Sequence, residues 1–256
     1  MAEKFDLVAT IAHNKKLFKL AIATPFYEVK GWSPYISSLV TSIKALEEMK
    51  IPWDYFELSG DSYVDRAKNT LVHRFMESDC THLMMIDSDM SWELEGFLRI
   101  IRAALAGFEL VGAGYPCKNK WDFYGCIPIL DQETGEVMGR EIEDIRLLSM
   151  ACVPGGFICY SRKAFEMTQP KLNKYQDYVN DINYWEYFKC NIEPESGIKV
   201  GEDVYFQIRY RELGGIVYLE PNATICHWGV KGWVGNYHVH LTETRKPKEE
   251  QAEQAA

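Results

Sequence analysis

Two acidic residues, Asp87 and Asp89, follow directly after the apolar run 83–86 and give the clearest chemical signal in the sequence. If the strand continues through them, side chains at i and i+2 leave the same face, so both carboxylates point the same way. Two carboxylates this close repel each other unless a cation or protons intervene. A divalent cation that bridges them to a diphosphate resolves this conflict. The alternative is a pair of solvated acids in a turn before Ser91, but the position after a buried strand favours a metal site.

His227, in the segment ATICHWG, closes the last strand-like run and is the candidate third ligand. Imidazole joined to carboxylates is a common ligand set for Mn²⁺ and similar ions. A half-buried histidine packed beside Trp228 is the alternative, and His238 or His240 would be a substitute ligand. We therefore expect a divalent metal, with Mn²⁺ preferred and Mg²⁺ as the second choice.

Glu202 and Asp203 open a helix that is predicted for 202–213. Acids in the first turn of a helix are stabilised by its dipole, whatever else they do. The functional interpretation is a carboxylate, Asp203, that acts as general base on an acceptor hydroxyl. Their position in the helix fits both interpretations.

Arg66, Lys68 and Asn69 lie in the helix that precedes the acidic pair. We expect Arg66 to neutralise a phosphate or to orient Asp87 or Asp89. A solvated helix face is the alternative.

Three further positions are weaker candidates. Lys118 follows the fourth predicted strand, where it can meet a diphosphate. Gly155 and Gly156 either let the backbone approach a bound sugar or turn a corner. Aromatic side chains in the irregular segment 170–200 could stack on a sugar, although such residues more often serve packing: Tyr175, Tyr178, Tyr184, Trp185 and Tyr187.

The elements that must position these residues alternate between strand and helix. Strands are predicted at 17–24 (closed by Pro25), 53–58, 81–87 and 109–115, and helices at 33–50, 62–78 and 92–106, with Ser33 and Asp61 as helix caps. This rhythm is typical of a parallel sheet with helices on its faces. In such sheets, ligands bind beyond the carboxyl ends of the strands. The acidic pair is expected at that edge.

The region after residue 118 differs in character. It contains hairpin-like segments from 123 to 153, a strand at 157–162 with a short helix, and the irregular segment 170–200, which we interpret as a lid or acceptor-side loop. We expect one domain over 1–241, with a nucleotide-sugar half at 17–118 and an acceptor half at 119–241. The polar segment 242–256 is expected to be disordered.

Composition and charge exclude several classes of protein. The chain has 256 residues, enough for a substantial core, and a net charge of -9 without a basic run, which argues against an extensive nucleic-acid surface. No apolar stretch reaches the roughly 18 residues that cross a bilayer. The N-terminus lacks the layout of a signal peptide. Seven cysteines without a Cys-x-x-Cys pair predict reduced thiols and no zinc site. A cytoplasmic location is expected, in the host cytoplasm if the protein is viral.

In chain order, the motifs resemble those of GT-A glycosyltransferases, and their spacing is similar to that in small family-2-like transferases of bacteria, phages and large viruses. The resemblance spans residues 17–233 and rests on Thr24-Pro25, Arg-Ala-Lys-Asn at 66–69, THLMMIDSDM at 81–90, Pro-Gly-Gly-Phe at 154–157 with Ser-Arg-Lys-Ala-Phe at 161–165, Gly-Glu-Asp-Val at 201–204, and His-Trp-Gly at 227–229. Single motifs of this kind are weak, but their common order is fairly specific.

The resemblance implies a GT-A fold: an α/β domain whose mostly parallel central sheet is flanked by helices, with a smaller antiparallel sheet on the acceptor side. It implies a metal bound by Asp87, Asp89 and His227, and the catalytic base at Asp203 beside Glu202. It also implies a set of positions at the nucleotide sugar: Thr24, Pro25, Phe26, Tyr27, Arg66, Asn69, Asp87, Ser88, Lys118 and Gly156.

The expected activity is transfer of a sugar from a nucleoside-diphosphate sugar to the hydroxyl of a glycan or another acceptor. A UDP-sugar is the first choice of donor and a GDP-sugar the second. The choice of nucleotide stays open, because the sequence reads Leu-Ser-Gly-Asp at 58–61 instead of the usual acidic pair before Gly-Ser. The choice between hexosyl and pentosyl transfer, and between inversion and retention, stays open.

Three other classes share parts of this pattern. A haloacid-dehalogenase-like phosphatase also begins with an apolar strand and Asp-x-Asp, but it needs Thr or Val where this chain has Ser91, and Asp87 comes late for that fold. A sugar nucleotidyltransferase needs a Gly-rich, Arg-containing loop after its first strand, which TPFYEVKGW is not. A non-catalytic carbohydrate-binding protein has no need of acids at three separate places.

Overall fold

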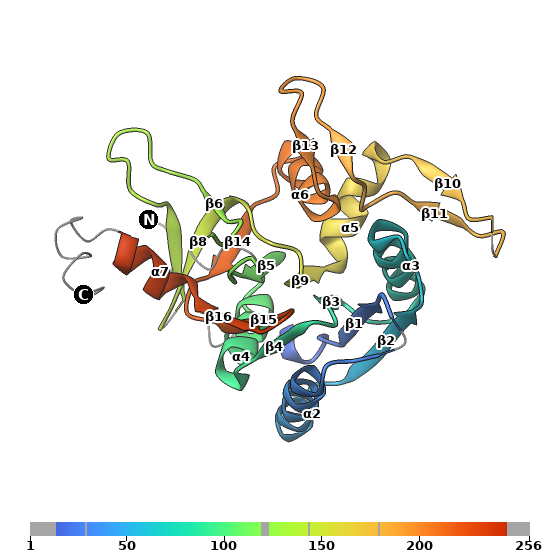
Figure 1. Cartoon of the computed structure of the whole chain (residues 1–256), viewed down its shortest axis with the longest axis horizontal. Helices are drawn as coiled ribbons and strands as arrows, with labels where there is room; N and C mark the ends of the chain where they lie inside the picture. The colour runs from blue at the N-terminus through green and yellow to red at the C-terminus, as the bar shows by residue number, and fades with distance from the viewer. Residues whose placement is uncertain (1–13, 29, 119–122, 143, 179, 245–256) are drawn as a thin grey trace.

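A mixed sheet forms the centre of the computed structural model, which describes residues 14–28, 30–118, 123–142, 144–178 and 180–244 (Figure 1). Its strands are β1 (Leu20–Phe26), β2 (Trp53–Ser59), β3 (His82–Ile86), β5 (Leu110–Ala113), β6 (Ile127–Pro128), β7 (Gly139–Ile142), β8 (Ile145–Cys152), β9 (Phe157–Ser161) and β14 (Val217–Glu220). The order is β2-β1-β3-β9-β5-β14-β8-β6, and β7 also pairs with β8. β2, β1, β3, β5 and β14 run in one direction, whereas β9 and β8 run against them. The predicted mostly parallel sheet is confirmed.

Helices cover both faces of this sheet. They are α2 (Ser33–Glu48), α3 (Val64–Glu77), α4 (Leu94–Leu105), α5 (Arg162–Thr168) and α6 (Glu202–Glu212), with a short 3₁₀ turn, η1 (Gln169–Lys171), after α5. Side chains of β1 alternate between the two faces. Leu20 and Ile22 lie in the apolar cluster with α2 and α4, whereas Ala21 and Ala23 lie in the cluster with α3, α5 and α6. The sheet is therefore buried on both faces.

Three small antiparallel sheets complete the molecule. Their strands are β4 (Met90–Trp92) with β15 (Thr224–Trp228) and β16 (Gly232–Asn236), β10 (Lys174–Gln176) with β11 (Asn183–Trp185), and β12 (Asn191–Ile192) with β13 (Lys199–Val200). The two hairpins β10–β11 and β12–β13 project outward beside α3 and α6, and α7 (Tyr237–Thr244) follows β16 (Figure 1). The predicted smaller antiparallel sheet is thus present, and β4 brings the segment after the acidic pair into it.

Several predicted boundaries are wrong. β1 continues through Pro25 to Phe26, because its pairing with β3 ends at Ala23 and Pro25 interrupts no ladder on that side. Trp92 belongs to β4, so the helix predicted from 92 begins at Leu94. Ser33 is the first helical residue, not the cap.

The predictions for the C-terminal segment, for membrane-spanning helices and for the cysteines are considered together. The helix α7 extends to Thr244, so residues 242–244 are helical and not part of a disordered tail; 245–256 lie outside the described residues. None of the helices within the described ranges is long and apolar enough to cross a membrane. All seven cysteines are free thiols, as predicted.

Arg162 anchors the carboxyl end of helix α3, which carries several candidate site residues. Its guanidinium donates hydrogen bonds to the backbone carbonyls of Phe75, Met76, Ser78 and Cys80 at 2.7–3.0 Å. These carbonyls lie at and beyond the carboxyl end of α3, where no helical N–H is left to meet them. Arg162 thereby ties α3 to the junction of β9 and α5.

We predict that His82 makes the stability of the fold depend on pH. Its ring stacks on Phe18 at 4.4 Å, and burial lowers the pKa of His82 from 6.5 to about 4. Because the pKa in the folded state lies below that in the unfolded state, the contribution of the neutral ring is complete above pH 6.5 and is lost as the pH falls toward 4. The free energy of unfolding should fall by about 2–3 kcal/mol over this range. Urea titrations at pH 7 and pH 4 should show a smaller fall for His82→Phe; an equal fall in both proteins would contradict the assignment.

Candidate functional site

Asp87, Ser88 and Asp89 form a turn between β3 and β4 at the carboxyl edge of the sheet. The N–H of Met90 donates to the carbonyl of Asp87 at 3.1 Å, and the N–H of Asp87 donates to the carbonyl of Gly156 at 3.0 Å. The argument from strand alternation is therefore wrong for this pair, because the two carboxylates are placed by a turn. The predicted edge is correct.

Asp87 has one buried oxygen that lacks a hydrogen bond. Its side chain is 30% exposed, but Oδ1 is buried and has no hydrogen-bond partner among the described residues; the nearest cation, Lys68 Nζ, is 3.6 Å away. Burial raises the pKa of Asp87 to about 6, and the nearby carboxylates of Asp89, Glu202 and Asp203 act in the same direction. An unsatisfied buried carboxylate oxygen is costly unless a cation meets it.

Lys68 is buried at the centre of this acidic group. It lies on α3, is 1% exposed, and donates to Glu202 Oε1 at 2.9 Å. Burial alone would lower the pKa of Lys68, but Asp87, Glu202 and Asp203 raise it well above its ordinary value, so the ammonium keeps its charge. Burial also acts to raise the pKa of Glu202, and Lys68 outweighs it and holds that pKa below its usual range. Lys68 thus joins the acidic turn to the start of α6.

Asp203 is held by backbone N–H groups. Oδ2 accepts from Gly155 N at 2.6 Å and Oδ1 accepts from Val204 N at 2.8 Å. Burial raises the pKa of Asp203 above its usual value. A Cβ at Gly155 would overlap Asp203, so only glycine fits this position. The Pro-Gly-Gly segment therefore fixes the carboxylate in place.

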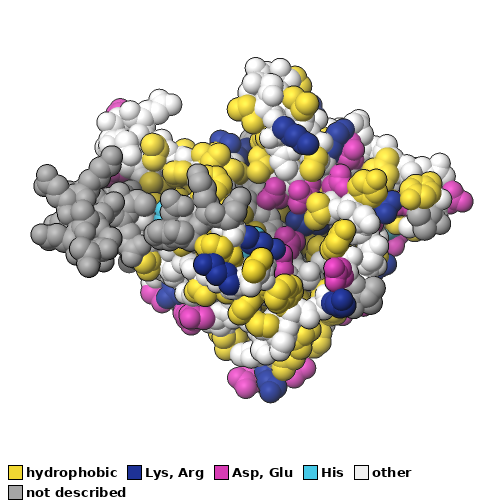
Figure 2. Space-filling model, viewed as in Figure 1, with side chains coloured by type: hydrophobic (Ala, Val, Ile, Leu, Met, Phe, Trp, Pro, Cys, Tyr) yellow, Lys and Arg dark blue, Asp and Glu magenta, His cyan; other side chains and the backbone are white. Residues whose placement is uncertain are grey.

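Gly156 and Tyr115 connect the acid at α6 with the acidic turn. Gly156 N donates to the hydroxyl of the buried Tyr115 at 2.7 Å, and a Cβ at Gly156 would overlap that hydroxyl and approach Asp87. Figure 2 shows acidic side chains gathered near the middle of this face, with basic side chains beside them. Sequence reasoning missed Tyr115, whose position just beyond β5 was the available signal.

His227 lies on β15 with one ring nitrogen turned toward Asp89. Nε2 is 3.7 Å from Asp89 Oδ2, whereas Nδ1 is 3.1 Å from the carbonyl oxygen of Pro116. A carbonyl only accepts, so Nδ1 carries the proton and the lone pair of neutral Nε2 faces the aspartate. Burial lowers the pKa of His227, which favours this neutral form. His240, the alternative, stacks instead on Tyr124 at 4.5 Å.

Lys118 makes an ion pair with Asp89 Oδ2, the same oxygen that His227 faces. Its stem runs beside Gly229, which follows β15. The charge of Lys118 stands where the expected cation and diphosphate would meet Asp89. The structure brings Lys118 to the acidic turn, and its contact with a diphosphate stays a prediction.

Arg66 and Asn69 have other partners. Arg66 forms two hydrogen bonds of 2.7 Å with Asp61, so the expectation that it orients Asp87 or Asp89 is wrong. Asp61 is not the helix cap; besides Arg66 it accepts from Tyr63 N at 2.9 Å. Asn69 is buried, and its amide exchanges two 2.9 Å hydrogen bonds with the backbone of Phe188. In this structure Asn69 anchors the segment before α6 and presents no free polar group.

The segment 24–27 divides between core and surface. Thr24 is fully buried, with its hydroxyl 2.5 Å from that of Tyr35, and Phe26 packs edge-on against the same ring. Tyr27 is 69% exposed and Pro25 is half-buried. A nucleotide pocket here would meet Pro25 and Tyr27, since Thr24 and Phe26 face α2.

The aromatic residues of 170–200 serve mainly packing. Tyr184 and Tyr187 are 1% and 2% exposed, and Trp185 is half-buried with Lys174 Nζ 4.2 Å above its ring. Tyr178 is the exposed member, at 84%.

A second acidic cluster with ligand spacing lies at the opposite end of the strands. It comprises Asp54, Asp79 and Cys80, whose potential ligand atoms lie within 4.8 Å of one another. Lys19 Nζ already lies 2.8 Å from Asp54 and 2.5 Å from Asp79. Burial raises the pKa of the Cys80 thiol to about 11, so it stays protonated. Lys19 therefore pairs with both carboxylates and balances one of their two charges, which leaves less negative charge here than at the acidic turn.

Comparison with known proteins adds no family assignment, because neither a protein-family model nor a curated protein matches the sequence. Similar solved structures include A197 from STIV, at 16% identity and a TM-score of 0.49 over 83% of this chain and 86% of that chain. GalNAc-T7, solved with UDP, GalNAc and Mn²⁺, is 11% identical with a TM-score of 0.49 over 83% of this chain and 44% of that chain. A third is 4-diphosphocytidyl-2C-methyl-D-erythritol synthase from Anaerococcus prevotii, at 14% identity and a TM-score of 0.33 over 80% of this chain and 99% of that chain.

The chain spans less than half of the GalNAc-T7 chain. TM-scores below 0.5 decide nothing about activity, which has to be argued from the residues of the site.

Proposed function

We propose that this chain is a metal-dependent glycosyltransferase that moves a sugar from a nucleoside-diphosphate sugar to an acceptor hydroxyl. The observation that best supports this proposal is the net charge of the site at the carboxyl edge of the sheet. Four carboxylates, those of Asp87, Asp89, Glu202 and Asp203, face two ammonium groups, which leaves two negative charges. One divalent cation would balance them.

The residues present fit such a cation. Asp87 supplies a buried oxygen without a hydrogen bond, and Asp89 and His227 converge within 3.7 Å of each other. Two carboxylates and one imidazole are a ligand set for Mn²⁺, with Mg²⁺ as the second choice. When bound, the cation acts as a Lewis acid toward the departing diphosphate.

The chain's own residues supply the remaining chemistry. Lys118, which pairs with Asp89, is placed to exchange that partner for a donor phosphate. Asp203 takes the proton of the acceptor hydroxyl, since its raised pKa makes it a better base than an ordinary aspartate. Lys68 holds the carboxylates of Asp87 and Glu202 in place by pairing with both. A UDP-sugar is the preferred donor and a GDP-sugar the alternative.

Calorimetric titration of UDP and GDP, with and without Mn²⁺, tests this proposal. We expect binding to be stronger with Mn²⁺, and we expect Asp89→Ala to weaken the Mn²⁺-dependent part by about tenfold or more, because a ligand of the ion is lost. Asp54→Ala, in the cluster that pairs with Lys19 at the other end of the strands, is the matched control and should bind as the unmodified protein does. Unchanged binding by Asp89→Ala would refute the metal assignment. Turnover of a phosphate monoester in place of a nucleotide sugar would favour the phosphatase alternative.

A further inference from the structure

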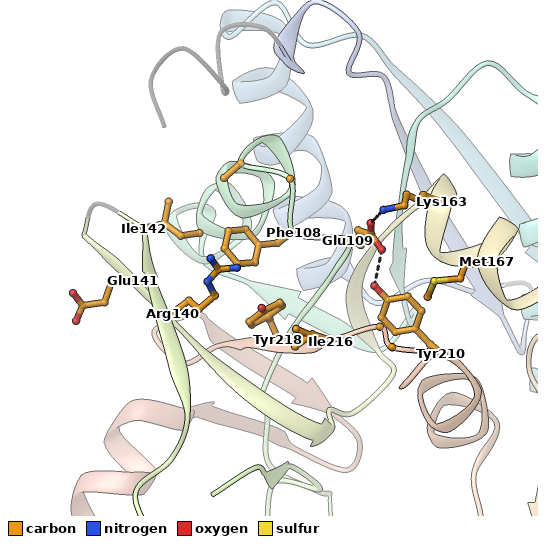
Figure 3. A pocket seen from close by; sticks show the side chains of 14 residues that line it. Phe108, Glu109, Arg140, Glu141, Ile142, Lys163, Met167, Tyr210, Ile216 and Tyr218 are labelled. Atoms are coloured by element: carbon orange, nitrogen blue, oxygen red, sulfur yellow. Dashed lines mark hydrogen bonds and ion pairs between the residues drawn. The ribbon is translucent and has the colours of Figure 1, made fainter. Parts of the chain in front are cut away.

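A cavity of about 710 Å³, whose lining side chains are drawn in Figure 3, is the second candidate site. It lies at the opposite edge of the sheet from the acidic turn. Glu109 and Ile216, which directly precede β5 and β14, belong to its wall, so it opens at the amino ends of these parallel strands. Tyr115 of the acidic site lies six residues further along the chain than Glu109, or about 20 Å at roughly 3.3 Å per residue. The cavity is thus separate from the proposed transfer site, and its volume is within the range that holds small-molecule ligands.

One wall presents a guanidinium on an aromatic ring. Arg140 and Ile142 project from β7 on the same side, toward Phe108, whereas Glu141 points away (Figure 3). The Arg140 guanidinium lies 5.9 Å from the centre of the Phe108 ring. Within the described part of the chain no carboxylate pairs with Arg140. Among the described residues, its hydrogen-bond donors are therefore open to a ligand.

The opposite wall presents a carboxylate that is already charge-balanced. Glu109 accepts a hydrogen bond from the buried Tyr210 hydroxyl at 2.8 Å and forms an ion pair with Lys163 (Figure 3). Ile216, which is 47% exposed, and Tyr218 supply apolar surface between the two walls. The cavity thus combines donors, acceptors and apolar faces without a strong net charge.

This combination excludes three classes of ligand. The carboxyl ends of α4 and α6 meet the cavity near Ala106 and Gly214, and their dipoles disfavour a phosphate or another strong anion. Bringing an apolar chain against Arg140, Glu109 and Lys163 would desolvate charged groups without hydrogen bonds in return. Arg140 and the Lys163–Glu109 pair leave no surplus of negative charge for a metal cation.

We propose that this cavity binds a neutral oligosaccharide. Sugar hydroxyls both donate and accept, so they can accept from Arg140 and donate to Glu109. The C–H faces of the sugar rings would lie against Ile216 and the Phe108 side of the cavity. The proposal does not depend on the transferase assignment. A second glycan-binding site would suit a glycosyltransferase, but the cavity could bind a glycan in a protein without that activity as well.

Ligand-observed NMR with maltotriose, cellotriose, lactose and chitobiose tests the proposal. We expect at least one of them to bind with a millimolar or tighter Kd. Arg140→Ala should weaken that Kd roughly tenfold, because hydrogen bonds from a charged donor are lost. Ile216→Asn, at an exposed position, removes apolar surface without changing any charge and should weaken that Kd several-fold.

Two controls separate this site from the rest of the chain. Arg146→Ala removes an exposed arginine from the neighbouring strand β8, outside the cavity, and should leave the Kd unchanged. Asp89→Ala disables the acidic turn and should also leave it unchanged. The proposal is refuted if none of the four saccharides binds, if Arg140→Ala and Ile216→Asn both leave the Kd unchanged, or if binding is lost in Asp89→Ala. The proposal is also wrong if inorganic phosphate binds and Arg140→Ala abolishes that binding, because the ligand would then be an anion.

Discussion

Asp203→Asn is expected to lower turnover by about two to four orders of magnitude while donor binding is retained. The amide oxygen can still accept from Gly155 N, which in the unmodified protein donates to Asp203 Oδ2 at 2.6 Å. The amide nitrogen cannot accept a proton from an acceptor hydroxyl. It also cannot accept from Val204 N, so a loss of stability of about 1 kcal/mol at the start of α6 is expected as well. Single-turnover kinetics, with the Kd of the donor measured separately by calorimetry, isolates the rate of transfer.

The control for this substitution is Asp131→Asn. Asp131 also accepts from backbone N–H groups, those of Glu133 and Thr134, but in an exposed turn outside both sites. It should show normal turnover. Loss of donor binding by Asp203→Asn with normal transfer of bound sugar would place Asp203 on the nucleotide side. Near-normal turnover would show that Asp203 only stabilises the start of α6.

The central strands and the acidic edge could be predicted because apolar runs have an unambiguous physical consequence. A short run such as 83–86 must be buried, and the first polar residue after it must lie where the strand leaves the core. The antiparallel insertion of β9 between β3 and β5 could not be predicted, because strand–helix rhythm carries no information on which later strand fills a gap. The turn at Asp87 could not be predicted for a similar reason. The residue at which a strand ends depends on the strands that pair with it, and the sequence does not name them.

Lys68 is the residue that the sequence could have revealed. It occupies the stripe of α3 that also carries Leu71, Val72 and Phe75, at the spacing of one helical face. All three of these neighbours are buried, so a lysine among them must be buried as well and must have acidic partners. Arg66 was the predicted partner of the acidic pair because it is charged and lies near the start of the helix. Asp61, five residues earlier in the chain, neutralises it. An acidic residue shortly before an arginine can therefore indicate a local ion pair.

Lys68→Met is expected to lower the free energy of unfolding by about 3–5 kcal/mol, because it removes the ammonium from buried carboxylates. Glu202 would lose its 2.9 Å hydrogen bond, and Asp87 would lose its nearest cation. Turnover should fall by roughly 10- to 100-fold, since the groups that orient the reacting carboxylates are displaced. Urea titration measures the first effect and steady-state kinetics the second.

Lys19→Met is the matched control, because Lys19 also pairs with two carboxylates, at the other end of the strands. Its partners are solvent-exposed, with Asp79 at 79%, so the loss of stability should be much smaller than in Lys68→Met and turnover should be unchanged. The double variant Lys68→Met/Glu202→Gln removes one uncompensated carboxylate together with the ammonium. It should therefore recover part of the stability lost in Lys68→Met, and this recovery reports on their interaction in a double-mutant cycle. Additive losses, or equal losses from Lys19→Met and Lys68→Met, would show that Lys68 fills space in the core without holding the carboxylates together.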